Sequence, residues 1–139
     1  MVDIKTVIFS GIGLFGAYVS DWLGGWDTGL QTLIIFMAID YTTGLIVAGV
    51  FKNSQKTEQG ALESDAAWKG LLRKGASLAV VLIACRLDLL LQTNIIRDAT
   101  VIAYIVNESL SITENIGLMG VHLPNCITNA IEALKEREQ

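Results

Sequence analysis

The segment from Thr28 to Phe51 restricts the fold of this chain more than any other, because Asp40 is its only charge. About 20 consecutive apolar residues in a helix cross the ~30 Å hydrocarbon core of a bilayer. Backbone groups in lipid must be hydrogen-bonded within the protein, and a helix achieves this within one segment. We therefore expect residues 28–51 to form a transmembrane helix.

The composition of the whole chain agrees with lipid as its surroundings. Of 139 residues, 52% are hydrophobic and 17% are charged, and the mean hydropathy is +0.50. A soluble chain of this length has too small an interior to bury so much apolar surface. We expect residues 1–139 to form a single all-α, polytopic membrane domain.

Two later segments, residues 75–96 and residues 99–120, are also expected to be transmembrane helices, although each contains two charges. The charges are Arg86 and Asp88 in the first of these segments and Glu108 and Glu114 in the second. Their apolar stretches are still long enough to cross a bilayer.

The first segment, residues 4–23, either crosses the membrane or lies in the interface. Its uncharged part, residues 6–20, forms only about 22 Å of helix. It spans the bilayer if Lys5 reaches the headgroups at one end and Trp22 anchors the other, and otherwise it lies in the interface. The chain is thus expected to have four, or alternatively three, transmembrane helices.

The basic residues predict the orientation of these helices. With four crossings, eight of the ten Lys and Arg residues fall on one side: Lys5, Lys52, Lys56, Lys69, Arg73, Lys74, Lys135 and Arg137. Arg86 and Arg97 lie in or near the other side. Because Lys and Arg accumulate in cytoplasmic loops, we expect the N- and C-termini and the loop 52–74 to be cytoplasmic.

Two shorter amphipathic stretches are expected on the cytoplasmic face. In residues 62–74, Trp68 suits the headgroup level, and the basic residues around it suit anionic lipid. Residues 124–136 are expected to form a C-terminal helix, because Pro124 suits a first turn and apolar residues follow at helical spacing. This helix either packs through one apolar stripe or contacts the membrane.

Several functions are disfavoured by the sequence. The net charge of -4 provides no basic face for nucleic acid. Gly11, Gly13 and Gly16 match the spacing of a dinucleotide-binding turn, but a membrane span follows rather than a βαβ unit, so no cofactor is expected. His122 is the only histidine and has no partner at ligand spacing, so neither a metal site nor an enzyme is expected.

Small residues four positions apart fit helix packing better than cofactor binding. Gly13 with Ala17, and Gly44 with Ala48, are such pairs, and Gly16 belongs to the same pattern. Small residues let helices approach closely in lipid. We expect these five residues to lie at helix interfaces.

Polar residues form a stripe along the otherwise apolar segment 99–120. The stripe consists of Asn107, Ser111, Glu114 and Asn115, with Glu108 on its flank. A charge in the middle of a bilayer costs at least ~2.5 kcal/mol, so such residues normally face other helices or water. The stripe is either a buried network within one subunit, or part of an oligomer interface or a water-filled lesion.

Three charges are predicted to lie at one depth. Counted from the cytoplasmic ends of their segments, Asp40, Arg86 and Glu108 lie ~17–18 Å into the membrane. A guanidinium between two carboxylates can form bidentate hydrogen bonds. We expect Arg86 to bond Asp40 or Glu108, within one subunit or across an interface.

Four motifs are spread over roughly residues 30–134. They are Asp40-Tyr41-Thr42-Thr43-Gly44, Lys69-Gly70-Leu71-Leu72-Arg73-Lys74, Leu87-Asp88, and Asn107-Glu108-Ser109-Leu110-Ser111-Ile112-Thr113-Glu114-Asn115 followed by Gly117, Gly120 and Pro124. Together they resemble the toxin-secretion and phage-lysis holin family. Residues 107–115 are the most specific part, because hydropathy alone does not select two acids and two asparagines. Arg86 departs from the family pattern.

The resemblance implies a small protein that accumulates in the bacterial cytoplasmic membrane, oligomerises and opens lesions at a set moment. Through such lesions an endolysin reaches the cell wall, or a large toxin leaves the cell. The implied partners are the lipid bilayer, further copies of the chain, and that endolysin or toxin. Two alternatives remain open: a small ion channel or transporter subunit that uses the intramembrane acids, and an antiholin or structural membrane partner.

Overall fold

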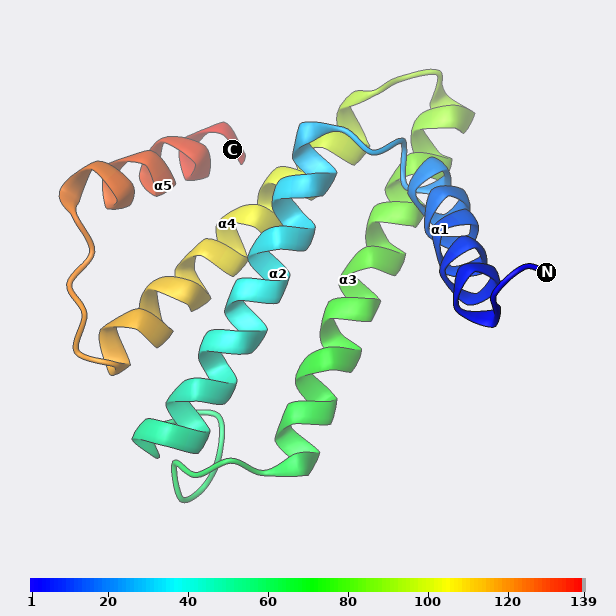
Figure 1. The fold of residues 1–139 in the computed structure, drawn as a ribbon. Coiled ribbons are helices and arrows are strands. Elements are labelled where there is room, and N and C mark those ends of the chain that lie inside the picture. Colours follow the sequence, from blue (N-terminus) through cyan, green and yellow to red (C-terminus); the bar gives the residue numbers. More distant parts are fainter. Residues whose placement is uncertain (139) are drawn as a thin grey trace.

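All regular elements among the described residues are helices (Figure 1). The computed structural model describes residues 1–138. The helices are α1 (Ile4–Trp22), α2 (Thr28–Ile46), the π-helical turn η1 (Val47–Phe51), α3 (Ser64–Leu91), α4 (Ile95–Leu118) and α5 (Asn125–Glu138). The prediction of an all-α fold is confirmed.

Helix α4 is the centre of the fold, because it contacts α2, α3 and α5 (Figure 1). Apolar side chains from three helices form the core around it: Leu30, Leu33 and Met37 of α2, Val81 and Cys85 of α3, and Val101 and Ile105 of α4. The C-terminal helix α5 folds back beside α4, and its Leu134 packs against this core. The expected C-terminal helix is present, and Leu134 is one apolar residue through which it packs against the rest of the chain.

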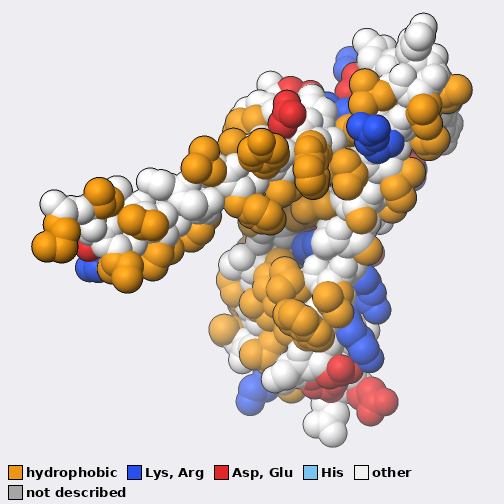
Figure 2. Space-filling model, turned by 90° about the vertical axis from the view of Figure 1, so that its right-hand side faces the viewer, with side chains coloured by type: hydrophobic (Ala, Val, Ile, Leu, Met, Phe, Trp, Pro, Cys, Tyr) orange, Lys and Arg blue, Asp and Glu red, His pale blue; other side chains and the backbone are white. Residues whose placement is uncertain are grey.

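Helix α1 has few contacts with the rest of the chain. It has no buried residue, and Val19 near its end is the residue that packs against the core. Figure 2 shows it extending away from the other helices, with apolar side chains on its surface. Exposed apolar residues lie on every side of it: Val7, Ile8, Phe9, Ile12, Leu14, Phe15 and Tyr18. A helix that is apolar on all sides is stable when lipid or other protein surrounds it.

Helix α3 begins earlier than the sequence predicts. A span from residue 75 and a separate surface stretch over residues 62–74 are expected, whereas residues 64–91 form one helix. The connection after η1 is therefore residues 52–63 rather than residues 52–74. The first three turns contain no proline and several good helix formers, so the helix continues through their charged residues.

One helical stretch meets a length and hydropathy criterion for crossing a membrane. Within the described residues this is Thr28–Phe51, which comprises α2 and η1 and has a mean hydropathy of 2.0. It agrees with the predicted span over residues 28–51. The other helices within residues 1–138 do not meet this criterion, so four transmembrane helices are not confirmed.

Arg97 fixes the corner where the α1–α2 turn meets the start of α4. Its Nε donates to the Leu23 carbonyl at 2.9 Å, and its Nη2 donates to the Gly25 carbonyl at 3.3 Å. Both terminal nitrogens bond the Asp27 carboxylate, which also accepts the Leu30 N–H at the N-terminus of α2. The hydrogen bonds from Arg97 lower the pKa of the Asp27 carboxyl below its ordinary value. A single guanidinium thus holds two connections together.

Asp88 fixes the neighbouring connection between α3 and α4. Its carboxylate accepts the Thr93 hydroxyl at 2.6 Å and the N–H groups of Ile96 and Arg97 at 3.1 and 2.8 Å. A carboxylate at this position bonds the first free N–H groups of a helix and interacts favourably with its dipole. The burial of Asp88, a charge within an apolar segment, is explained by this capping.

Gly24 provides a test of the Arg97 corner. It has φ of +94°, and a Cβ at this position would lie 2.7 Å from Arg97 Nε. Gly25 has a similar φ of +98°, but its Cβ would meet no atom within 4 Å. Both Gly24→Ala and Gly25→Ala add backbone strain of about 1–2 kcal/mol, and Gly24→Ala should destabilise further by displacing the guanidinium.

Thermal unfolding in detergent, followed by circular dichroism, compares the two variants. We expect a lower Tm for Gly24→Ala than for Gly25→Ala. Equal losses would mean that the contact between Gly24 and Arg97 does not contribute to stability.

Candidate functional site

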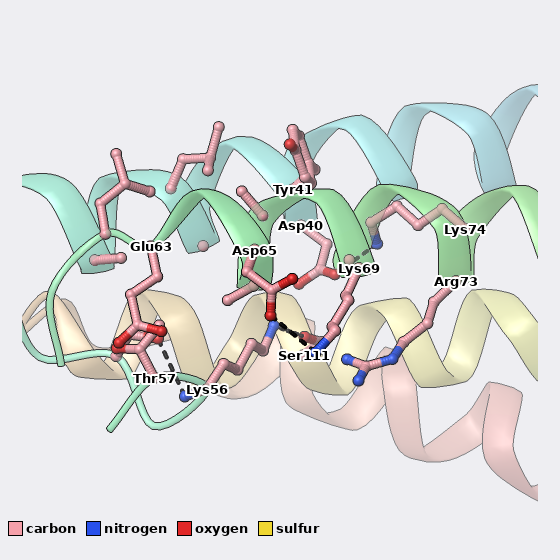
Figure 3. A pocket seen from close by; sticks show the side chains of 18 of the residues that line it. Asp40, Tyr41, Lys56, Thr57, Glu63, Asp65, Lys69, Arg73, Lys74 and Ser111 are labelled. Carbon is pink, nitrogen blue, oxygen red and sulfur yellow. Dashed lines mark hydrogen bonds and ion pairs between the residues drawn. The ribbon is translucent and has the colours of Figure 1, made fainter. Parts of the chain in front are cut away.

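Lys74 lies between two buried carboxylates in the middle of the helical body. Its Nζ is 2.7 Å from Asp40 Oδ2 and 2.6 Å from Glu108 Oε2, and the Lys74 side chain is only 14% exposed. Figure 3 shows Lys74 and Asp40 pointing toward one another from α3 and α2. We call Asp40, Lys74 and Glu108 the ion triad. It joins α2, α3 and α4 through charged side chains.

The three residues meet because they lie at one depth along their helices. They are ~17, ~15 and ~15 Å from the helix ends nearest to residues 52–63. The early start of α3 carries Lys74 to this depth. A helix that began at residue 75 would place Lys74 before its first turn, far from the depth of the two acids.

Arg86 does not occupy the position predicted for it within one chain. It is exposed on α3 and takes part in none of the ion pairs among residues 1–138. At 3.6 residues per turn, Arg86 lies about 120° around α3 from Lys74, so the two face different neighbours. The prediction that Arg86 bonds Asp40 or Glu108 within one subunit is therefore wrong, and Lys74 provides the cation.

Asn115 completes the hydrogen bonding of Asp40. Its Nδ2 lies 3.0 Å from Asp40 Oδ1, 3.2 Å from the Asp40 carbonyl and 3.0 Å from Thr43 Oγ1. One carboxylate oxygen of Asp40 thus faces Lys74 and the other faces Asn115. Because Asn115 is only 4% exposed, these bonds also satisfy an amide that burial would otherwise destabilise.

A cleft of about 490 Å³ leads from the surface to the ion triad. Its walls come from α2, α3, α4 and the connection 52–63, and exposed charges line it: Lys56, Glu58, Glu63, Asp65, Lys69 and Arg73. Lys69 pairs with Asp65 at 2.8 Å, and Lys56 Nζ lies 3.4 Å from Ser111 Oγ (Figure 3). Apolar side chains such as Leu45 and Leu62 also line the cleft, but its charged residues let it hold water next to the ion triad.

The charges of the ion triad do not balance. Two carboxylates face one ammonium, and both carboxylates are largely removed from solvent. Removing one partner of a buried ion pair leaves a charge without compensation, which is strongly unfavourable. The triad therefore favours the arrangement in which α3 stays against α2 and α4.

The polar stripe of α4 is divided between two environments. Glu108 and Asn115 are buried, whereas Asn107 and Ser111 line the cleft. Glu114 is exposed. Glu108, placed on the flank of the stripe by its spacing, is instead central to the site. Within one chain, the buried members form a network between helices and the others remain accessible.

The predicted packing residues also divide into two groups. Ala48 is buried, and a Cβ at Gly44 would lie 3.7 Å from the Asn115 amide, so this pair lies at a contact between helices. On α1, a Cβ at Gly13 or Gly16 would meet no atom of the described chain within 4 Å, and Ala17 is exposed. The small residues of α1 thus have no packing partner within residues 1–138.

Sequence reasoning missed Lys74 and Arg97 as site residues, although a signal was present for both. Lys74 lies on the same side of α3 as buried Val81 and Asp88, at helical spacing. Arg97 similarly precedes buried Val101 by one turn. Extending the core-facing side of each helix toward its N-terminus would have found both residues.

Substitution of Lys74 tests the ion triad. Lys74→Met should lower the free energy of unfolding by about 3–5 kcal/mol, because it leaves two buried carboxylates without a cation. A triple variant that adds Asp40→Asn and Glu108→Gln to Lys74→Met should regain part of the lost stability. The control is Lys69→Met, whose exposed pair with Asp65 should contribute roughly 0.5 kcal/mol or less.

Denaturation in detergent measures the free energy of unfolding of the unsubstituted protein, Lys74→Met, the triple variant and Lys69→Met. If Lys74→Met were no less stable than Lys69→Met, the triad would not hold the helices together. A further loss of stability on removing the two acids would lead to the same conclusion.

Known proteins similar to this chain share most of its length. A family model described as the bacteriophage holin family matches residues 17–136. A "Probable holin" of Bacillus phage phi105 is 37% identical over 107 residues, which cover 76% of this chain and 73% of the phage protein. An "Uncharacterized 14.9 kDa protein in nagH 3'region" of Clostridium perfringens is 35% identical over 140 residues, 99% of this chain and 100% of that protein. No solved structure matches. Because the family model matches most of the chain, including the ion triad and the cleft, the chain belongs to the bacteriophage holin family.

Proposed function

We propose that this chain is a holin that oligomerises in the bacterial cytoplasmic membrane and opens lesions that release an endolysin or a toxin. Family membership and the 37% identity to a phage probable holin support this function. The family implies a cytoplasmic membrane location and is generally non-enzymatic. The observation that carries the proposal is the ion triad, because it places charges at the middle of helices that expose many apolar side chains.

The ion triad gives a single copy a closed state. While Lys74 bridges Asp40 and Glu108, its ammonium stabilises both carboxylates inside the protein. If α3 separates from α2 and α4, the triad and the cleft residues become exposed and require water or groups on other copies. Several opened copies could place these polar faces around a water-filled lesion and keep their apolar faces in lipid.

We further propose that α1, α2, α3 and α4 all cross the membrane, with the N-terminus and residues 52–63 in the cytoplasm. Two features support the crossing of α3 and α4: Lys74 and Glu108 pair with each other, and Asp88 caps α4. The cleft then opens to the cytoplasm beside residues 52–63, and Lys52 and Lys56 there, with Lys69 and Arg73 at the start of α3, support this orientation.

Thiol labelling before lysis tests this topology. With Cys85 and Cys126 replaced by alanine, Trp26→Cys should react with a membrane-impermeant thiol reagent in intact cells. Gln59→Cys should react only after the membrane is permeabilised, because residues 52–63 are cytoplasmic in this arrangement. Both positions are exposed in the structure, so local burial does not protect either. Labelling of Gln59→Cys in intact cells would show that the orientation is wrong.

Induced expression in a bacterium that carries a co-expressed endolysin and a potential-sensitive dye tests the function. A holin should leave the membrane potential intact during a delay, then collapse it abruptly and release the endolysin. A small channel that uses the intramembrane acids would give selective, saturable flux without endolysin release. An antiholin or structural partner would give neither. Membrane insertion of the protein without any loss of potential would contradict the proposed function.

A further inference from the structure

An exposed apolar stripe runs along α3 on the side opposite to the ion triad. Its members recur at spacings of three or four: Leu72, Ala76, Val80, Ile83, Leu87 and Leu90. The stripe is ~27 Å long, and the other described helices of the chain leave it uncovered. Between Ala76 and Leu90, Arg86 is the charge on this side of the helix.

Arg86 lacks a counter-charge within residues 1–138, where it takes part in none of the ion pairs. It lies ~8 Å from the Leu91 end of α3. In the proposed topology this places its Cα below the headgroups of the outer leaflet. A charge at this depth is costly without a partner, so Arg86 requires an anionic group from outside its own chain.

Among the acids at this end of the molecule, Asp21 remains available. Asp27 and Asp98 both pair with Arg97, and Asp88 caps α4. Asp21 is exposed on the last turn of α1 and is absent from the ion pairs of the described chain. Relative to the ends of their helices, Asp21 and Arg86 differ in depth by ~6 Å, which a long arginine side chain can cover.

The face of α1 around Asp21 suits close contact with another helix. Ser10, Leu14 and Ala17 lie on this face at helical spacing, with Gly13 beside them. Small residues at such positions let two helices approach closely in lipid. Within its own chain, α1 borders α3 only through its last turn, and Ala17 and Gly13 stay exposed.

We propose that copies of this chain contact one another through α1 of one copy and the α3 stripe of the next, with Asp21 bonded to Arg86. A second copy is favoured over lipid because it supplies charges for both residues, whereas a lipid phosphate would serve Arg86 and leave Asp21 unpaired. In the proposed topology α1 and α3 run in the same direction through the membrane. The two charges therefore meet when copies share one orientation.

The proposed contact uses different surfaces of the two copies. Each copy offers α1 to one neighbour and α3 to another, so the contact can repeat into a ring or an open chain. This inference rests on the membrane assembly in the proposed function and names the surface that forms it.

Cross-linking between two differently tagged forms of the chain tests the contact. Both forms carry Cys85→Ala and Cys126→Ala. One carries Ala17→Cys and the other Ile83→Cys, so a short thiol cross-linker can join only different copies. The matched control replaces Ile83→Cys by Ile35→Cys, on α2. Ile35 and Ile83 are 55% and 56% exposed and lie at similar depths, ~10 and ~12 Å from their outer helix ends.

We expect several-fold more cross-linking between Ala17→Cys and Ile83→Cys than in the control with Ile35→Cys. Arg86→Asp in the form with Ile83→Cys should reduce this yield several-fold. Asp21→Arg in the form with Ala17→Cys should do the same. The two reversals together should restore most of it, because the opposite charges again face each other. Equal yields at Ile83 and Ile35 would overturn the proposal.

The charge reversals also separate a protein partner from a lipid partner. If Arg86 bonds lipid phosphate, Asp21→Arg cannot compensate Arg86→Asp, and a failure to recover would overturn the proposed pair. Cross-linking without collapse of the membrane potential would contradict the holin function but not the contact. Normal lysis without preferential cross-linking at Ile83 would contradict the contact alone.

Discussion

The pairing of two buried carboxylates with Lys74 is the interaction on which the arrangement of α2, α3 and α4 depends. Each helix brings to the ion triad one charge that is costly to bury alone, so the three must meet at one depth. This requirement explains why α3 is one continuous helix in contact with both neighbours. It also explains why a polar cleft reaches the middle of an otherwise apolar body.

A second polar anchor, at Arg97, lies at the opposite end of the same three helices. Arg97 and Asp88 tie the turn after α1 to the start of α4, and the apolar core fills the space between this corner and the ion triad. Helix α1 has neither anchor along its length and lies outside the core. The body formed by α2, α3 and α4 is thus internally satisfied, whereas α1 and the outer side of α3 expose surfaces suited to lipid or to other copies.

Much of this fold could be predicted from the sequence, because apolar runs and charge clusters mark helices directly. The bounds of α1, α2 and α4 lie within a few residues of their predicted segments. The shared depth of Asp40 and Glu108 also followed from counting residues along these segments. The identity of their cation did not, because charged residues at the start of α3 look like a membrane-surface stretch when hydropathy alone is considered. The Arg97 corner joins residues about 70 positions apart, and a local pattern carries no information about such a contact.

In the proposed function, the ion triad keeps the protein closed until lesions form. The most direct measurement is the delay between induction and loss of membrane potential for Lys74→Met, compared with Lys69→Met at equal amounts of protein in the membrane. The account predicts a shorter delay for Lys74→Met and an unchanged delay for Lys69→Met, because only the first substitution breaks the buried bridge. Equal delays for the two variants would contradict it.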